Sequence, residues 1–306
     1  MGRLRACLLL AFTGLGCLAL FVSRSDATPG TVRLIAPGVW FREGDMDLGH
    51  CNNIIIEMKD YLIVVDANFP SGARAAMADA KRVSQKPVKY VFDTHHHGDH
   101  LYGNVIWTQA GATTLAFKGV ADELKRLEPA RWQDAAKTRK DVAETNRDAP
   151  EPPRQDINEN IFVLNDGSRK VEFHHFGWAH TRGDGFVYLP KDQVLCTGDA
   201  VVNGPYNATM DANIGNWPTV LQNAEKLKVK FVLPGHGVPA GRELISGQAQ
   251  FMTELHKAVK AGIDSGRKLE DLQASLTLPP AVSTWVSANS LKGQVRDAFN
   301  EITKTK

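Results

Sequence analysis

Short apolar runs alternate with helix-like segments along the first half of the chain. Runs rich in β-branched and aromatic residues predict strands, whereas Ala-rich stretches with polar residues at regular intervals predict helices. The predicted strands cover residues 31–42, with a turn at Pro37–Gly38, and residues 53–58, 61–66, 88–92 and 113–117. A helix is predicted at 71–84, with Ser71 as its N-cap.

The second half repeats this order. Residues 121–145 are charged and helix-forming, and Pro129 is expected to split them. Strands are predicted at 161–164, 171–176, 185–189, 193–197 and 230–233, and helices at 217–227, 248–263, 269–275 and 287–304. Two successive sets of strands and helices predict two sheets packed face to face with helices outside. This fold is a four-layer αββα sandwich of the α/β class.

The first residues differ from the rest of the chain. Arg3 and Arg5 precede an apolar stretch at 6–22, and small residues follow at 25–27, which predicts a secretory signal peptide over 1–27. A retained membrane anchor is the alternative, because the stretch is close to the shortest length that spans a bilayer. No later segment is apolar enough to cross a membrane. The predicted location is therefore periplasmic or secreted.

Composition narrows the class of protein. The 306 residues are 43% hydrophobic and 23% charged, which is typical of a globular domain with a small appendage. The net charge of +2 argues against nucleic acid as a main partner. Removal of the leader leaves only Cys51 and Cys196. An exported protein could pair them, but we expect two buried free thiols.

The segment Thr94–His100 carries the strongest chemical signal. It has the pattern H-x-H-x-D-H directly after the predicted strand at 88–92. Alternate side chains of an extended segment share a face, so His95 and His97 can point to one place. Asp99 and His100 follow in a turn that can aim them at a second place. Such a set of donors suits two adjacent metal ions.

Three later segments repeat this arrangement. His180, Asp199 and His236 each lie in a Gly-containing turn after an apolar run. Glycine allows tight turns and positive φ, so the donor side chain can be aimed inward. The sequence therefore predicts that donors from several strand ends meet at one cleft.

These motifs resemble those of the metallo-β-lactamase fold superfamily, over roughly Asp66 to His236, and the glyoxalase II version most closely. The resemblance implies the αββα fold and a set of metal ligands. The first ion would bind His95, His97, His180 and Asp199, and the second Asp99, His100, His236 and the bridging Asp199. Asp66 would orient the ligand loop. The family domain would cover 28–245, followed by a helical extension at 246–306 packed on it.

The resemblance implies a metal-dependent hydrolase that acts on a small molecule. Two Zn²⁺ ions would supply a metal-bound hydroxide that attacks a lactam, lactone, thioester or ester carbonyl, with Asp99 and Asp199 as catalytic residues. Familiar β-lactamases carry a cysteine where this chain has Asp199, and a lysine that has no counterpart in 200–206. A β-lactamase proper is therefore an alternative and not the first interpretation.

Two further alternatives stay open. A mononuclear non-haem iron enzyme, like the persulfide dioxygenases of the superfamily, would use the positions of His95, His180 and Asp199. The full set of donors favours two zinc ions over one iron. A metal-binding protein without strong catalysis is the other alternative.

Several residues near the motifs have less certain roles. Asn203, Tyr206 and Asn207 follow Asp199 and are interpreted either as substrate contacts or as turn residues. The side chains of Trp40, Met46, Leu48 and Trp178 are considered for an apolar rim, although core packing is favoured for both tryptophans. His96 should point away from the metals, and the expectation for His50 and His256 is a surface position. His174 and His175 are interpreted as structural.

Overall fold

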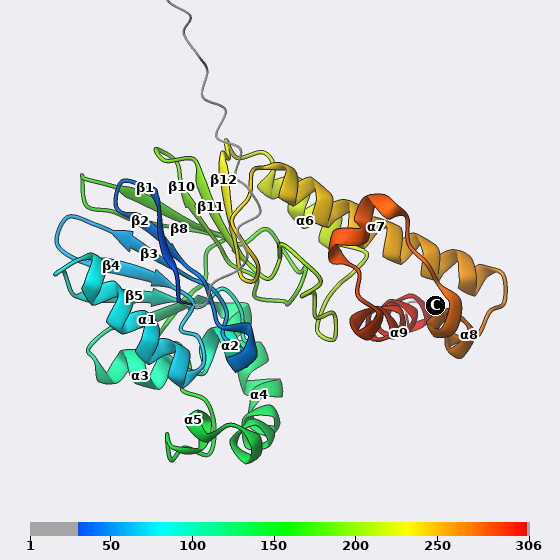
Figure 1. The fold of residues 1–306 in the computed structure, drawn as a ribbon, viewed down its shortest axis with the longest axis horizontal. Coiled ribbons are helices and arrows are strands. Elements are labelled where there is room, and N and C mark those ends of the chain that lie inside the picture. Colours follow the sequence, from blue (N-terminus) through cyan, green and yellow to red (C-terminus); the bar gives the residue numbers. More distant parts are fainter. Residues whose placement is uncertain (1–29, 305–306) are drawn as a thin grey trace, which may run out of the picture.

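Two β-sheets pack face to face, and helices cover their outer faces (Figure 1). The computed structural model describes residues 30–304, so the predicted signal peptide lies outside the described residues. The first sheet has the order β1-β2-β3-β4-β5-β6-β7, and the second has the order β12-β11-β10-β9-β8. The four-layer αββα prediction is confirmed.

The strands of the first sheet are β1 (Val32–Ala36), β2 (Val39–Arg42), β3 (Asn53–Glu57), β4 (Leu62–Val65), β5 (Val88–Phe92), β6 (Thr113–Phe117) and β7 (Gln155–Ile157). Those of the second are β8 (Ile161–Asn165), β9 (Lys170–His174), β10 (Phe186–Leu189), β11 (Val194–Gly198) and β12 (Phe231–Pro234). The predicted strands are all present, and β7 is an addition that lacks an apolar run.

The helices are α1 (Pro70–Val83), α2 (Gly98–Leu101), α3 (Asn104–Gln109), α4 (Lys118–Thr138), α5 (Lys140–Ala143), α6 (Trp217–Ala224), α7 (Glu243–Asp264), α8 (Leu269–Ser275) and α9 (Ala288–Lys304). Short 3₁₀ helices occur at Met46–Leu48 (η1) and Pro280–Trp285 (η2). No helix among residues 30–304 has the length and apolarity needed to cross a bilayer.

Apolar side chains from both sheets form the central core. The Phe92 ring lies 4.7 Å from that of Phe173, so the two sheets meet through aromatic contact. Buried Trp107 belongs to the cluster that joins α1 and α3 to the first sheet, and buried Trp217 belongs to the one that joins α6 and α7 to the second. Each sheet is therefore covered on both faces.

Strand direction determines where a site can form. In the first sheet β4, β5 and β6 run parallel. In the second sheet β11 and β12 run parallel, and β9 shares their direction because β9 and β11 are both antiparallel to β10. The carboxyl ends of these strands converge on one edge of the sandwich, where loops can bring side chains together.

The predicted break at Pro129 is wrong, because α4 continues through it and ends at Thr138. Tertiary contacts hold both sides of the proline. The buried Glu128 carboxylate accepts hydrogen bonds from Tyr102 and Arg131, and Trp132 is fully buried in a small core cluster. This packing stabilises a helix that local preference alone would interrupt.

The expectation for the cysteines is met. Cys51 and Cys196 are buried free thiols, and burial raises the pKa of Cys51 to about 12. The C-terminal segment is helical as predicted: α7 leads away from the sheets, and α9 packs against both α7 and α8 (Figure 1). The proposed boundary between a family domain at 28–245 and an extension at 246–306 stays a prediction.

Candidate metal centre

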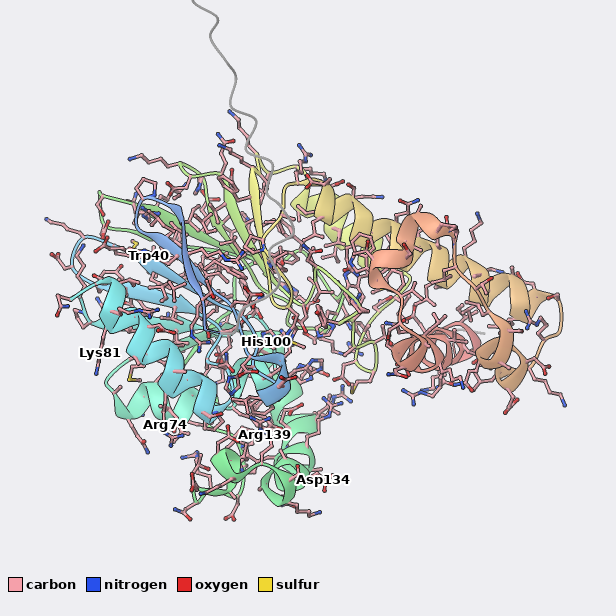
Figure 2. All side chains as sticks on the ribbon, viewed as in Figure 1. Trp40, Arg74, Lys81, His100, Asp134 and Arg139 are labelled. Atoms are coloured by element: carbon pink, nitrogen blue, oxygen red, sulfur yellow. The ribbon has the colours of Figure 1, made fainter. Side chains whose placement is uncertain are left out.

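The predicted donors all lie just beyond the carboxyl ends of strands. The donors, with the strand that precedes each, are Asp66 after β4, His95, His97, Asp99 and His100 after β5, His180 after β9, Asp199 after β11 and His236 after β12. Figure 2 labels His100, which lies within α2 at this end of the sheets, well apart from Trp40 in the same view. The structure brings these side chains together as two facing groups that share Asp199.

The first group consists of His95, His97 and His180, whose ring nitrogens lie within 4.8 Å of one another. His180 Nδ1 lies 3.0 Å from the carbonyl oxygen of Ala208, which can only accept, so this nitrogen carries the proton. His97 Nε2 lies 2.9 Å from a carboxylate oxygen of Asp211 and donates to it. The opposite nitrogens, His180 Nε2 and His97 Nδ1, face each other at 3.0 Å.

Two neutral imidazoles in these tautomers would present lone pairs to each other. Burial, reinforced by the neighbouring His97, lowers the pKa of His180 to about 3, so this ring is neutral near pH 7. Burial and the nearby His100 also lower the pKa of His95 well below its usual value. A positive charge must lie between such lone pairs, and a bound metal ion supplies one without a proton.

The second group consists of Asp99, His100 and His236 and has the same design. His100 Nδ1 donates to Asp66 Oδ2 at 2.9 Å, and His236 Nδ1 contacts the Met46 sulfur at 3.2 Å. Their Nε2 atoms therefore face inward, 3.4 Å apart. Asp99 Oδ2 lies 3.0 Å from His236 Nε2, so a carboxylate faces the same point as the two imidazoles.

Asp199 reaches both groups. One carboxylate oxygen lies 3.4 Å from His100 Nε2, and the other lies 3.5 Å from His236 Nε2 and 3.9 Å from His180 Nε2. Burial opposes ionisation of this carboxyl, but the adjacent His236 and His100 prevail and lower its pKa to about 2. The side chain is thus a carboxylate near neutral pH, placed to contact two cations at once.

Asp66 forms hydrogen bonds with the segment 94–100, which carries four of the proposed ligands. Its Oδ1 accepts the backbone N–H of Thr94 at 2.8 Å, while its Oδ2 accepts from His100 Nδ1. Its backbone adopts a positive φ of 67°, which aspartate tolerates better than most residues. One carboxylate therefore fixes both the start of the His segment and the ring orientation of His100.

Two buried atoms test whether the residues fit a metal. His95 Nε2 and Asp199 Oδ1 are buried and have no hydrogen-bond partner in the structure. Such atoms are rare in folded proteins because desolvation without a partner costs about 1–3 kcal/mol each. Both belong to one trio with His100 whose donor atoms lie within 4.8 Å. Imidazole nitrogens and carboxylate oxygens are also the donors that Zn²⁺ accepts, so the residues fit zinc.

The predicted substrate contacts occupy different environments. Tyr206 lies at the surface, with its ring 6.0 Å from that of His236. Asn203 donates through its amide to the carbonyl of Val238, so it braces the turn that carries His236. Asn207 is buried, and its side-chain oxygen accepts from Gln248 of α7. The structure brings only the tyrosine to the mouth of the site.

The remaining histidines are used elsewhere. His96 turns toward Asp211 and Glu128, as its alternate position predicted. The expectation that His50 lies at the surface is wrong. His50 is buried, and its Nε2 contacts the Ser71 hydroxyl at 2.8 Å, because the polar loop at 43–50 folds onto the start of α1.

His174 pairs with Glu172, and His175 Nδ1 donates to the Asp184 carbonyl, so both are structural. The Trp40 side chain packs with the α1 cluster, and Trp178 donates to the Asp211 carbonyl. Trp40 is therefore a core residue, whereas Trp178 is half-buried and lines the cleft beside Asp211.

Sequence reasoning missed Asp211, which is the partner of His97. Arg131 of α4 binds both Asp211 oxygens, at 2.7 and 2.9 Å. This guanidinium and the two neighbouring histidines hold the pKa of Asp211 far below its usual value despite burial. Asp211 lies in an irregular segment with no periodic pattern, so no signal in the sequence marked it.

Comparisons with known proteins agree with this geometry. The family model described as the metallo-beta-lactamase superfamily matches residues 46–236. A metallo-beta-lactamase type 2 from Bacillus cereus is 25% identical over 200 residues, which cover 63% of this chain and 70% of that protein. The metallo-beta-lactamase FIM-1 from Pseudomonas aeruginosa, solved in a mono-zinc form, has 22% identity and a TM-score of 0.59 over 76% of this chain and 98% of its own.

A metallo-beta-lactamase from Hirschia baltica gives a similar result. Its TM-score is 0.59 at 23% identity, over 74% of this chain and 98% of that structure. At such identities the solved structures support the fold alone. The family match ends at residue 236, so helices α7, α8 and α9 lie beyond it.

Proposed function

Because this chain belongs to the metallo-beta-lactamase superfamily and is a metal-dependent hydrolase, we propose that it uses two zinc ions to hydrolyse a carbonyl bond. The substrate classes are lactams, lactones, esters and thioesters. The first ion would be held by His95, His97 and His180, and the second by Asp99, His100 and His236. Asp199 would contact both ions.

One observation carries this proposal, the inward nitrogens of His97 and His180, which face each other at 3.0 Å as two acceptors because the outward nitrogen of each ring donates to an oxygen. The inward nitrogens of His100 and His236 face each other at 3.4 Å. Negative groups around these two rings raise the pKa of both against the effect of burial, so this group also attracts a positive charge. Two facing pairs of ring nitrogens beside one shared carboxylate favour two cations over one.

Bound zinc ions would lower the pKa of a coordinated water to about 7 and polarise the substrate carbonyl. The protein residues would orient the reaction and move its protons. Asp99 stays ionised, because the nearby His100 and His236 lower its pKa well below the usual value against the effect of burial. Its side chain is also partly exposed, so it can accept a proton and release it to solvent.

The surface around the centre suits a substrate with an apolar part. Met46 and Tyr206 are among the exposed large hydrophobic side chains, at 45% and 38% exposure. The Met46 sulfur and the Tyr206 ring both approach His236, so these apolar groups stand beside the proposed second ion. They can pack on a substrate and exclude water from the reacting carbonyl.

The relatives named as metallo-beta-lactamases make a β-lactam one substrate to test and do not fix the choice. This chain has Asp199 in place of a cysteine ligand, and the segment 200–206 contains no lysine or arginine to grip a substrate carboxylate. We therefore propose lactones, esters and thioesters as candidate substrates together with lactams.

A metal analysis and a substrate panel test the proposal together. The purified protein is expected to hold two zinc ions per chain and to hydrolyse at least one lactam, lactone, ester or thioester of the panel. A chelator should abolish that hydrolysis, and added zinc should restore it. One iron per chain with thiol-dependent oxygen uptake would instead support the dioxygenase alternative. Hydrolysis that survives complete metal removal would refute the proposal.

We also propose that the chain is exported and that residues 1–27 are removed. The support is the basic start, the apolar stretch and the small residues at 25–27. The N-terminal sequence of the mature protein in a bacterial host is expected to begin near residue 28, in the periplasmic or secreted fraction. Recovery of the intact N-terminus in the membrane fraction would support a retained anchor instead.

A further inference from the structure

The segment 207–215, here called the 207–215 loop, supplies the outer hydrogen-bond partners of two proposed ligands. The carbonyl of Ala208 accepts from His180 Nδ1 at 3.0 Å, and the Asp211 carboxylate accepts from His97 Nε2 at 2.9 Å. The position of this loop therefore determines which nitrogen of each ring faces inward. The loop contains no regular helix or strand, so its own backbone ladder does not fix it.

The C-terminal helices hold the start of this loop. Gln248 of α7 donates to the Asn207 side-chain oxygen at 2.9 Å, and Gln294 of α9 donates to the Asn207 backbone carbonyl at 3.0 Å. All three side chains are buried. Helices from both sides of the extension thus meet at the residue that precedes Ala208.

Two carboxylates of α9, one turn apart, bind residues 209, 214 and 215 of the loop. The Thr209 hydroxyl donates to Asp297 Oδ2 at 2.7 Å. The backbone N–H groups of Ile214 and Gly215 donate to the two oxygens of Glu301 at 2.7 and 2.8 Å. These charge-assisted bonds are of the stronger kind, and they flank Asp211 on both sides.

The sandwich contacts the loop at Ala208, Asp211 and Asn213, whose N–H donates to the Ala179 carbonyl at 2.8 Å. Arg131 and Trp178 bind Asp211 itself. Between α4 and the C-terminal helices lies an open cleft of about 970 Å³ that is lined on one side by residues 209–213 of the loop. This side of the loop faces the open cleft, so the contacts with α7 and α9 add to those that the sandwich makes.

We propose that α7 and α9 help to determine the geometry of the metal centre. They position His97 and His180 through the 207–215 loop, with Asp297 and Glu301 as positioning residues that touch neither metal nor substrate. This inference rests on the proposed metal centre. It extends the site into a helical segment beyond the residues that the family model matches.

A double-mutant cycle on Thr209 and Asp297 tests this inference. Thr209→Val keeps the side-chain shape but removes the donor, and Asp297→Ala removes the acceptor. Each variant is expected to bind Zn²⁺ about tenfold more weakly, at the lower end of the 10–100-fold range for outer partners of metal ligands. The double variant should be no weaker than either single variant, because both lose the same hydrogen bond.

Three measurements separate positioning from general damage. Zinc affinity is measured by chelator competition, the ligand field by the visible spectrum of the Co²⁺-substituted protein, and folding by thermal unfolding. Thr209→Ser and Asp297→Asn retain the hydrogen bond and should restore affinity and spectrum. Lys292→Ala, an exposed change on the same helix, should match wild type. Glu301→Gln provides a second probe if Asp297→Ala fails to fold.

Two results would overturn the inference in distinguishable ways. If the wild type binds zinc and Thr209→Val and Asp297→Ala have its zinc affinity and its Co²⁺ spectrum, the C-terminal helices do not position the ligands. If the wild type binds neither Zn²⁺ nor Co²⁺, the proposed metal centre fails and this inference fails with it.

Discussion

Replacing Asp199 with asparagine is expected to reduce hydrolysis at least about a thousandfold, a loss of about 4 kcal/mol in transition-state stabilisation. Asp199 contacts His100 with one carboxylate oxygen and both His180 and His236 with the other. A neutral amide keeps the shape but removes the negative charge that two adjacent cations require. The variant should therefore lose bound zinc and activity together.

Zinc content per chain and turnover of a substrate that the wild type hydrolyses measure this effect. Asp134→Asn is the matched control, because the Asp134 side chain is 77% exposed on α4 and lies far from His100 (Figure 2). This control should keep both quantities. An Asp199→Asn protein with two zinc ions and normal turnover would show that the bridging role is wrong.

Replacing Gly235 with alanine is expected to impair the centre almost as strongly, although Gly235 is not a donor. A Cβ at this position would lie 2.1 Å from Asp199 Oδ1 and 2.8 Å from the backbone carbon of Gly198. The Gly235 N–H also donates to the Gly198 carbonyl at 2.8 Å, so the two strand ends cannot easily separate. The added methyl should displace the Asp199 carboxylate and cost about 1–3 kcal/mol of folding stability.

The expected Gly235→Ala protein folds, holds less than half the wild-type zinc and loses at least about a hundredfold in turnover, the effect of misplacing a reacting group by about 1 Å. Gly293→Ala is the control, since a Cβ there meets nothing within 4 Å and alanine is the better helix former within α9. Wild-type zinc content in Gly235→Ala would contradict the crowding that the structure implies.

This glycine also refines an expectation from the sequence. Glycines beside the donors were predicted to allow positive φ, and Gly177, Gly198 and Gly237 do adopt it, at 121°, 49° and 85°. Gly235 is not among the residues with positive φ. Its role is to leave room for the Asp199 carboxylate. This space depends on how β11 and β12 pair, and a sequence pattern does not show that pairing.

Much of the fold could be predicted because its strands are short apolar runs. Val194–Gly198 is typical, since it is buried at every position, and apolar packing on both faces makes such a run visible without its neighbours. The strand β7 (Gln155–Ile157) was missed because two of its three residues are exposed, and it forms only by pairing with β6. Pro129 misled the prediction because buried contacts override a local preference.

The donors could be predicted for a similar reason, because each follows an apolar run in a recognisable motif. Their outer partners could not. Ala208 contributes a backbone carbonyl, which any residue would offer, and Asp211 lies in a segment placed by Arg131 and by the C-terminal helices. Contacts that depend on the docking of an irregular loop leave no periodic trace along the chain.

The split of the donors between two sheets has a consequence for how the protein matures. The segment 95–100 belongs to the first sheet, whereas His180, Asp199 and His236 come from the second, up to 141 residues later. A nascent or partly folded chain can therefore supply only some of the ligands. All of them are in place only after the two sheets have packed together. Under the proposed export and zinc centre, the supply of zinc outside the cytoplasm would then decide how much of the protein becomes active.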